Sequence, residues 1–130
     1  MADIVKLLQE QPDFCSMAGA SNIDISNAEQ LLALRFASDY RQYVAAFGAA
    51  SFSNHELTGV CKSKRLNVVD VTITERKNNV VPNDWYVLEQ TGVDGIVFWQ
   101  AQSSDIYQTS PNMPYKKICN SLSEYLTKIT

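Results

Sequence analysis

The sequence has 130 residues, of which 45% are hydrophobic and 19% are charged, and its formal net charge is −3. This balance is typical of one globular domain built on a single core, so we expect residues 1–130 to form one domain, and it excludes a disordered chain. No stretch approaches the ~20 apolar residues of a membrane-spanning helix, and no signal peptide opens the chain, so we expect a cytoplasmic protein with no membrane partner.

The first part of the sequence favours short helices. The apolar patch Ile4–Leu8 predicts one or two helical turns. Ser26 and Glu29 match a capping box, in which both side chains accept backbone N–H groups, and predict that a helix begins at Ser26. A further helix should begin at Ser38 and end at Gly48. Its apolar residues recur at the spacing of one helical face: Tyr40, Tyr43, Val44 and Phe47.

The segment that follows has weaker signals. Residues Ala49–Asn54 are small or polar and predict a loop, and Glu56–Cys61 predicts a short strand interrupted by Gly59. Asn67–Lys77 fits two structures. Its Val, Thr and Ile content favours a strand, whereas Asn67 is suited to cap a helix. The residues alone leave strand and helix open.

The next part of the sequence predicts a sheet. Three aromatic and β-branched runs, Trp85–Gln90, Ile96–Gln102 and Asp105–Thr109, are separated by turn sequences. Runs of this length joined by short turns are typical of antiparallel strands. We therefore expect an antiparallel meander, which Pro111 and Pro114 should end because proline breaks regular structure.

The last residues predict a closing helix. Ser121 and Glu124 form a second capping box. The apolar residues that follow share one helical face: Leu122, Tyr125, Leu126 and Ile129. The predicted fold is therefore α+β, with helices at the N-terminus, a central antiparallel meander sheet and a C-terminal helix packed on that sheet.

Candidate catalytic and metal-binding residues are few. His55 is the one histidine, and Gly59 stands where a metalloprotease helix would carry its second histidine. The three cysteines, Cys15, Cys61 and Cys119, form no Cys-x-x-Cys pair. We expect no metal, no cofactor and no enzymatic activity. A hydrolase that uses two carboxylates is an alternative, but 14 acidic residues make chance pairs inevitable.

Charge is unevenly distributed along the chain. Pro82–Tyr115 contains four acidic residues and no Lys or Arg, whereas Cys61–Val81 contains five basic and two acidic residues. Binding to nucleic acid needs basic side chains that neutralise phosphates, and an acidic stretch repels phosphates but attracts a basic protein. We therefore expect no direct binding to nucleic acid.

Several short segments carry a family resemblance in the same order along the chain. They are Ala28-Glu29, Leu32, Phe36, Tyr40, Tyr43-Val44, Phe47-Gly48, the segments 55–60 and 82–89, Ile106-Tyr107 and the segment 121–126. This ordered set resembles the SUKH superfamily, although Ala33 and Ala37 replace its usual Gly and Pro. Because that superfamily places a helix at the corresponding position, the resemblance favours a helix for Asn67–Lys77.

The resemblance implies a protein that binds other proteins. Many bacterial SUKH proteins resemble immunity proteins against polymorphic or contact-dependent toxins, whose toxic domains are often nucleases or deaminases. We therefore expect an immunity protein that binds and neutralises one cognate toxin domain by stoichiometric complex formation. The alternative is a non-enzymatic regulatory or scaffolding adaptor for endogenous partners, which the eukaryotic relatives resemble.

On the immunity hypothesis, the segment without basic residues is expected to contact the toxin. Glu89, Asp94 and Asp105 are the candidate interface charges, because acidic groups speed the encounter with a basic toxin. Trp99 and Tyr107 are the candidate aromatic anchors. The alternative for both aromatic residues is that they face the core.

Overall fold

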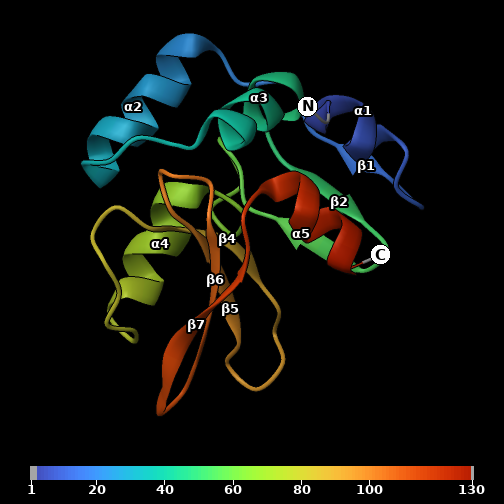
Figure 1. The fold of residues 1–130 in the computed structure, drawn as a ribbon. Coiled ribbons are helices and arrows are strands. Elements are labelled where there is room, and N and C mark those ends of the chain that lie inside the picture. Colours follow the sequence, from blue (N-terminus) through green and yellow to red (C-terminus); the bar gives the residue numbers. More distant parts are fainter. Residues whose placement is uncertain (1–2, 130) are drawn as a thin grey trace.

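Five helices and two antiparallel sheets make up residues 3–129, the part of the chain that this computed structural model describes (Figure 1). In chain order they are α1 (Ile4–Gln9), β1 (Cys15–Ser16), α2 (Asn22–Leu32), α3 (Ser38–Phe47), β2 (Ala50–Phe52), β3 (His55–Leu57), α4 (Val68–Arg76), β4 (Tyr86–Gln90), β5 (Val97–Gln100), β6 (Ile106–Ser110), β7 (Met113–Cys119) and α5 (Leu122–Ile129). Helices α1, α2 and α3 lie across one end of the molecule, and the β6–β7 turn projects from the other.

The predicted antiparallel meander is confirmed. Strands β4, β5, β6 and β7 are neighbours in that order, and each pair is antiparallel. A smaller sheet has the order β1-β2-β3. The two sheets meet where the Thr58 N–H, directly after β3, donates to the Leu88 carbonyl of β4 at 2.9 Å. Strand β3 therefore covers part of the β4 edge and leaves β7 as the open edge of the meander.

Two strands correct the sequence predictions. Strand β2 lies inside Ala49–Asn54, which the small residues predict as a loop, because Ala50 and Phe52 are buried and pair with β3. Strand β7 contains Pro114, which predicts a break. The missing N–H of a proline is tolerated there because β7 is an edge strand.

Helix α2 begins before the predicted capping box. The Ser21 hydroxyl accepts the Asp24 N–H at 3.1 Å and caps the helix, so Ser26 lies within it. The carboxylate of Glu29 instead accepts the Phe36 N–H at 2.8 Å and pairs with Arg41. The prediction of a helix is thus correct, but the predicted N-cap is wrong.

Helix α3 has the predicted apolar face, since Tyr40, Tyr43, Val44 and Phe47 are all buried. Gly48 ends the helix with a φ of 69°, a left-handed conformation that glycine adopts without a Cβ penalty. Gly59 is required for a different reason. A Cβ on Gly59 would lie 1.8 Å from the Gly48 carbonyl oxygen, so the two segments can meet here only as bare backbone.

The ambiguous segment after residue 66 is a helix, as the family resemblance favours. The Asn67 side chain accepts the Val69 N–H at 2.9 Å and caps α4. The Thr72 hydroxyl of α4 accepts the Val87 N–H at 3.0 Å, which ties the helix to β4. The β-branched residues of this helix are thus held by tertiary contacts that outweigh their strand propensity.

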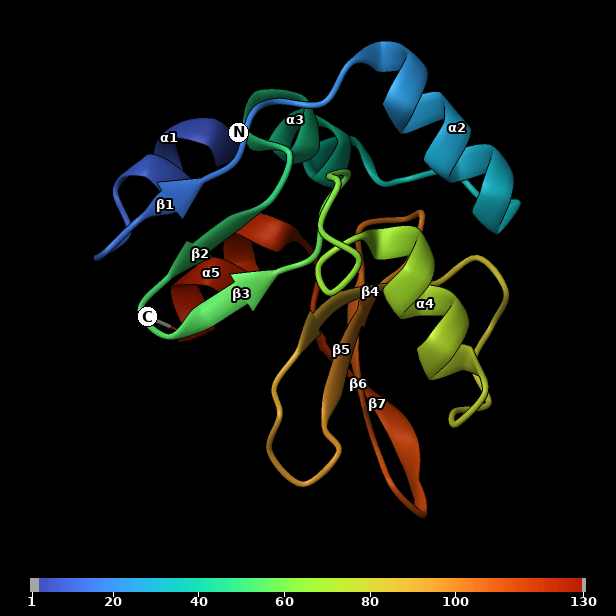
Figure 2. The same cartoon turned by 180° about the vertical axis from the view of Figure 1, so that it is seen from behind.

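The C-terminal helix packs on the sheet, as predicted (Figure 2). Ser121 accepts the Glu124 N–H at 3.1 Å, and Glu124 reaches back to the N–H of Asn120 at 3.2 Å. The half-buried Asp39 side chain accepts the Leu122 N–H at 2.8 Å and so joins the starts of α3 and α5.

The meander carries apolar packing on both faces. Tyr86 and Leu88 face the main core with the helices, whereas Val87 and Trp99 face a smaller cluster covered by Val71 of α4. The second cluster continues toward the β6–β7 turn, beyond the end of α4. That uncovered continuation is where the candidate site lies.

Candidate functional site

The structure places Glu89 in the core and corrects its predicted role as an interface charge. Glu89 is only 3% exposed. Its carboxylate accepts hydrogen bonds from the Tyr125 hydroxyl and from Nδ1 of His55, the latter at 2.9 Å. The pKa of Tyr125 is raised, because burial and the adjacent Glu89 charge both disfavour the phenolate. Glu89 therefore joins β3, β4 and α5 and is not free to meet a partner.

Trp99 is likewise a core residue, which corrects its predicted role as an anchor. Its side chain is 0% exposed, and its indole N–H donates to the Thr109 hydroxyl at 2.8 Å. Trp99 pairs directly with Tyr107 in the β5–β6 register, so both rings lie on the same face of the sheet. Trp99 supports the residues nearer the surface and makes no contact with solvent.

The predicted acidic face is not continuous. Asp105 pairs with Lys117 at 3.2 Å, and Asp94 lies in the β4–β5 turn with a φ of 53°. These two residues are at opposite ends of the meander. Among the described acidic residues of Pro82–Tyr115, only Asp84 and Asp94 have no ion-pair partner. The electrostatic part of the predicted interface is therefore much smaller than the sequence indicates.

Tyr107 does lie at the surface, as part of a cluster of three aromatic rings. The Trp85 ring stacks on Tyr107 with centroids 4.0 Å apart and an interplanar angle of 15°. Tyr115 meets Trp85 edge-on at 4.7 Å and Tyr107 at 5.8 Å. These contacts place β6, β7 and the start of β4 in one aromatic layer.

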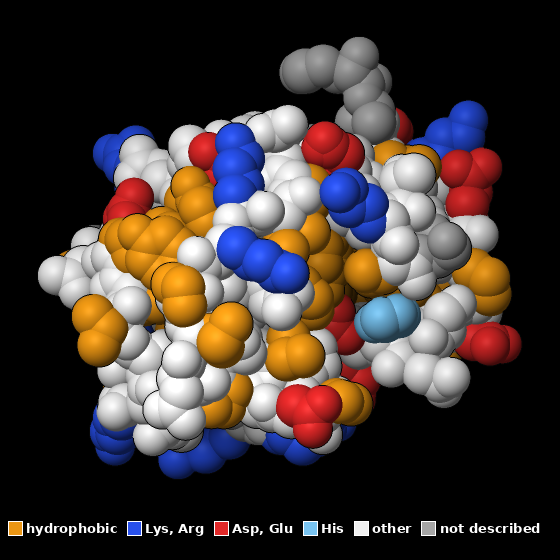
Figure 3. All heavy atoms as spheres, turned by 60° about the horizontal axis from the view of Figure 1, so that its bottom comes forward, with side chains coloured by type: hydrophobic (Ala, Val, Ile, Leu, Met, Phe, Trp, Pro, Cys, Tyr) orange, Lys and Arg blue, Asp and Glu red, His pale blue; other side chains and the backbone are white. Residues whose placement is uncertain are grey.

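This layer opens onto solvent at the β6–β7 turn. We define the aromatic surface as Val80, Tyr107, Met113 and Tyr115 together with the buried Trp85, on which the two tyrosine rings pack. Val80 is 99% exposed, Met113 66% and Tyr115 48%. A shallow hollow of about 460 Å³ runs between the residue 78–80 loop and the turn, and Val80, Met113 and Tyr115 line it. Figure 3 views the molecule from this end and shows hydrophobic side chains gathered on it beside basic ones.

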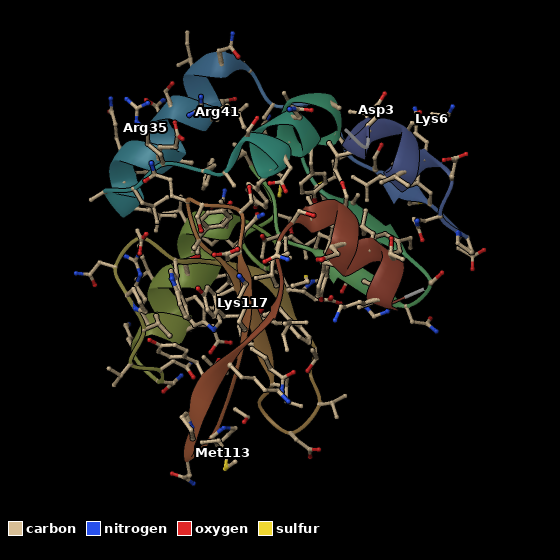
Figure 4. All side chains as sticks on the ribbon, in the orientation of Figure 1. Asp3, Lys6, Arg35, Arg41, Met113 and Lys117 are labelled. Carbon is tan, nitrogen blue, oxygen red and sulfur yellow. The ribbon has the colours of Figure 1, made fainter. Side chains whose placement is uncertain are left out.

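The polar groups around the aromatic surface are of both charges. Figure 4 shows Met113 at the tip of β7 and Lys117 further along the same strand. Lys116 and Lys117 lie on β7, and Asp84 directly precedes Trp85. A mixed polar rim around an apolar centre is the usual composition of a protein–protein interface.

Arg76 fixes the loop that carries Val80. Its guanidinium group donates to the Asn83 carbonyl at 2.8 Å and to the Trp85 carbonyl at 3.3 Å. Partial burial lowers the pKa of Arg76 but leaves the group charged. The loop beyond α4 is thereby tied to the end of the helix, so the aromatic surface is held in place from behind.

Of the five residues of the aromatic surface, sequence reasoning predicted only Tyr107 and missed Val80, Trp85, Met113 and Tyr115. Tyr115 and Met113 lie in β7, a strand that was not predicted because Pro111 and Pro114 indicate a break. Val80 lies in a loop without a motif. The signal that could have found Tyr115 is its strand-like neighbourhood, Tyr115–Cys119, beside the predicted β6. No pattern in the sequence marks Val80.

Neither a metal-binding cluster nor a membrane-spanning helix is found in the described part of the chain. In residues 3–129, no group of three or more His, Cys, Asp or Glu side chains is placed to hold a metal ion. No helix in the same range is both long and apolar enough to cross a membrane. His55 has one ring nitrogen engaged by Glu89. The aromatic surface is the strongest candidate site on this geometry.

A comparison with models of protein families identifies the family of this chain. The model of the SUKH_5 family, described as SMI1-KNR4 cell-wall, matches residues 1–130. The chain is a member of the SUKH_5 family. A search of curated proteins found no match.

The residues that carry the SUKH resemblance build the scaffold of this SUKH_5 protein. The Tyr43 hydroxyl donates to the Thr58 carbonyl at 2.8 Å, and the Tyr40 hydroxyl lies 2.8 Å from the Thr58 hydroxyl. Gly48 and Gly59 form the close backbone crossing described above. These residues are buried, whereas the most exposed residues of the aromatic surface, Val80, Met113 and Tyr115, lie outside the family segments.

Proposed function

We propose that this SUKH_5 protein is an immunity protein that binds a cognate toxin domain and neutralises it by stoichiometric complex formation. The toxin is expected to target nucleic acid, as polymorphic and contact-dependent toxins often do. The observation that carries the proposal is the aromatic surface: a SUKH_5 scaffold that presents Val80, Met113 and Tyr115 to solvent around two further aromatic rings.

The physical argument rests on which side chains contribute most to binding. Aromatic residues in the centre of an interface dominate its energy, and truncation of one such residue costs about 2 kcal/mol or more. Tyr115 suits this role because its ring already rests on Trp85 and Tyr107, so little side-chain entropy is lost on binding. Val80 and Met113 flank it and would exclude water.

Charge has a smaller part in this proposal than the sequence suggests. Asp84 lies next to the aromatic surface and Asp94 lies in the neighbouring turn, and both are free to meet a basic toxin. Lys116 is also nearby and opposes them. We therefore propose that apolar contacts set the lifetime of the complex, while these acids adjust the rate of encounter.

In this proposal the protein inhibits the toxin without catalysing a reaction and without binding nucleic acid. A net charge of −3 and a surface with both signs give no basic groove for phosphates. The toxin would be blocked by occupation of its surface. Whether an inhibitor works this way is measured by titration, since toxin activity should vanish at one equivalent of inhibitor.

The test is coexpression with a toxin encoded beside this gene. Wild-type protein should rescue growth and purify with the toxin, and the Tyr115→Ala/Met113→Ser variant should lose both properties. Ile23→Ser is the matched control, because Ile23 is also an exposed apolar residue but lies on α2. Absence of rescue with every neighbouring toxin, or equal rescue by both variants, would contradict the proposal.

The family description favours one second candidate. The words SMI1-KNR4 cell-wall describe the SUKH_5 family and name no toxin. A regulatory or scaffolding adaptor could use the same aromatic surface for an endogenous partner. Affinity purification distinguishes the two: a housekeeping complex that is lost in the Tyr115→Ala/Met113→Ser variant supports the adaptor, and a toxin lost in that variant supports the immunity protein.

A further inference from the structure

A second hollow lies between helices α2 and α4, away from the aromatic surface. It has a volume of about 750 Å³. One wall is the α2 face with Ala28 and Leu31, and the other is the start of α4 with Val69. Figure 2 shows the two helices side by side on this side of the molecule, with α2 above α4. The hollow flanks the start of α4, whereas the aromatic surface lies beyond its end.

The lining of this groove is mainly apolar and partly exposed. Leu31 is 70% exposed, and Met17 on the floor is also exposed. The floor between them consists of Ala18, Gly19 and Ala20, whose small side chains leave the space open. Gly19 packs so closely on α3 that a Cβ would lie 2.4 Å from the Ala45 carbonyl oxygen, so the floor is fixed in position.

Acidic groups face the groove from both walls. Asp24 lies in the first turn of α2 and Asp70 in the first turn of α4. Neither carboxylate has an ion-pair or side-chain hydrogen-bond partner within residues 3–129. Lys62 is the one basic residue among the lining residues, and it pairs with neither acid. The groove therefore combines an apolar floor with an excess of negative charge.

We propose that this groove is a second docking site, and that it takes a short segment of a partner protein in which apolar side chains stand next to Lys or Arg. Its volume is within the range of about 300–1,000 Å³ that is typical of binding pockets. A groove between two helices accepts an amphipathic segment through spaced apolar anchors. The unpaired Asp24 and Asp70 supply charges complementary to a basic flank on either side of those anchors.

This inference does not depend on the toxin-binding role of the aromatic surface. The two surfaces share no residue, since the groove is lined by residues of 17–31 and 60–70. An occupant of one surface leaves the other free. A single protein could then hold two partners, or hold two parts of one partner.

The experiment compares three short synthetic peptides that share a Leu-rich helical face and carry Lys, Gln or Glu at the flanking positions. Binding is measured by calorimetry and mapped by amide chemical-shift changes on the full-length protein. We expect the Lys peptide to bind ~10-fold or more tightly than the Glu peptide, with shifts at Met17, Leu31 and Val69, because two carboxylates contribute to its affinity.

Variants of exposed residues assign the binding to the groove. Asp24→Asn/Asp70→Asn should remove most of the preference for Lys over Glu, and Leu31→Ser should weaken all three peptides. Asp94→Asn and Ile23→Ser are the matched controls, since both positions are exposed and lie outside the groove. All four variants change exposed side chains, and a thermal melt of each checks that the fold is retained.

Labelling of the cysteines in the wild-type protein is a second test of this assignment. Cys61 lines the groove, and burial raises the pKa of its thiol, so it should react slowly with a maleimide. The bound Lys peptide should slow the labelling of Cys61 and leave the exposed Cys15 unaffected. Equal affinity for the three peptides, no saturable binding of any, or shifts confined to the aromatic surface would each overturn the proposal.

Discussion

Tyr40, Tyr43 and Tyr86 lie in the core with every hydroxyl group hydrogen-bonded, whereas Tyr107 and Tyr115 cover the outer end of the same molecule. The first group joins α3, β4 and the Thr58 segment and belongs to the family pattern. The second group packs mainly on other aromatic rings and keeps part of its surface in water. Similar residues therefore stabilise the fold in one region and are left partly exposed to solvent in the other.

Disruption of the close backbone crossing between Gly48 and Gly59 should destabilise the core more than any other change described here. Gly59→Ala places a Cβ 1.8 Å from the Gly48 carbonyl oxygen, so we expect a loss of more than about 4 kcal/mol in the free energy of unfolding. Urea denaturation measures it. Gly92→Ala is the control, because nothing lies within 4 Å of that Cβ and only its φ of 71° is unfavourable. A similar, small effect of both substitutions would contradict the packing described here.

Alkaline pH should lower the stability of the fold through the buried tyrosines. Burial raises the pKa of Tyr40, Tyr43, Tyr86 and Tyr125 above the ordinary 10.0. Above about pH 10 the unfolded chain loses these protons and the folded protein keeps them, so stability falls as the pH rises, by up to ~1.4 kcal/mol per pH unit for each tyrosine. Unfolding curves between about pH 9 and pH 11 test this sign. A stability that stays constant over this range would show that these hydroxyls are accessible to solvent.

Removal of Glu89 tests the junction between the two sheets and α5. Glu89→Ala leaves the His55 and Tyr125 polar groups without their buried partner, and we expect a loss of about 3 kcal/mol in the free energy of unfolding. Glu56→Ala is the control, because the Glu56–Arg65 pair is exposed and screened by solvent, so its removal should cost much less stability. If the two losses were equal, Glu89 would have no special structural role.

The aromatic surface should respond weakly in the same assay. Tyr115→Ala removes a half-exposed ring at the edge of the sheet, and we expect a change of about 1 kcal/mol or less in the free energy of unfolding. Calorimetric melting of the variant beside Glu89→Ala measures the contrast. A loss as large as that of Glu89→Ala would place Tyr115 with the core residues and remove the distinction between the two regions.

Much of the fold could be predicted because local patterns and tertiary packing agree. The capping residues of α5, the apolar face of α3 and the alternating strands of the meander each carry their own signal. Ser26 was a misleading signal, because Ser21 offers the same capping chemistry earlier in the chain. Strand β7 was not predicted because proline is disfavoured in interior strands but tolerated in edge strands. The sequence alone does not show which strand lies at the edge of the sheet.

The site could be predicted only in part, since exposure depends on what covers a strand. Trp99 and Tyr107 lie on one face and are direct neighbours, yet Trp99 is beneath other elements and Tyr107 reaches the surface. Glu89 is an acid in an acidic segment, and only the fold shows that His55 and Tyr125 surround it. The sequence period predicts which face of a strand a residue lies on, but the elements that pack over that face determine whether the residue is buried.

We propose that the aromatic surface binds the toxin, and the affinity of Tyr115→Ala for a toxin encoded beside the gene tests this proposal. Titration calorimetry on folded protein should show a loss of about 2 kcal/mol, or roughly 30-fold in Kd, with Ile23→Ser equal to wild type. If Tyr115→Ala bound the toxin as tightly as wild type, the aromatic surface would not be the toxin-binding site.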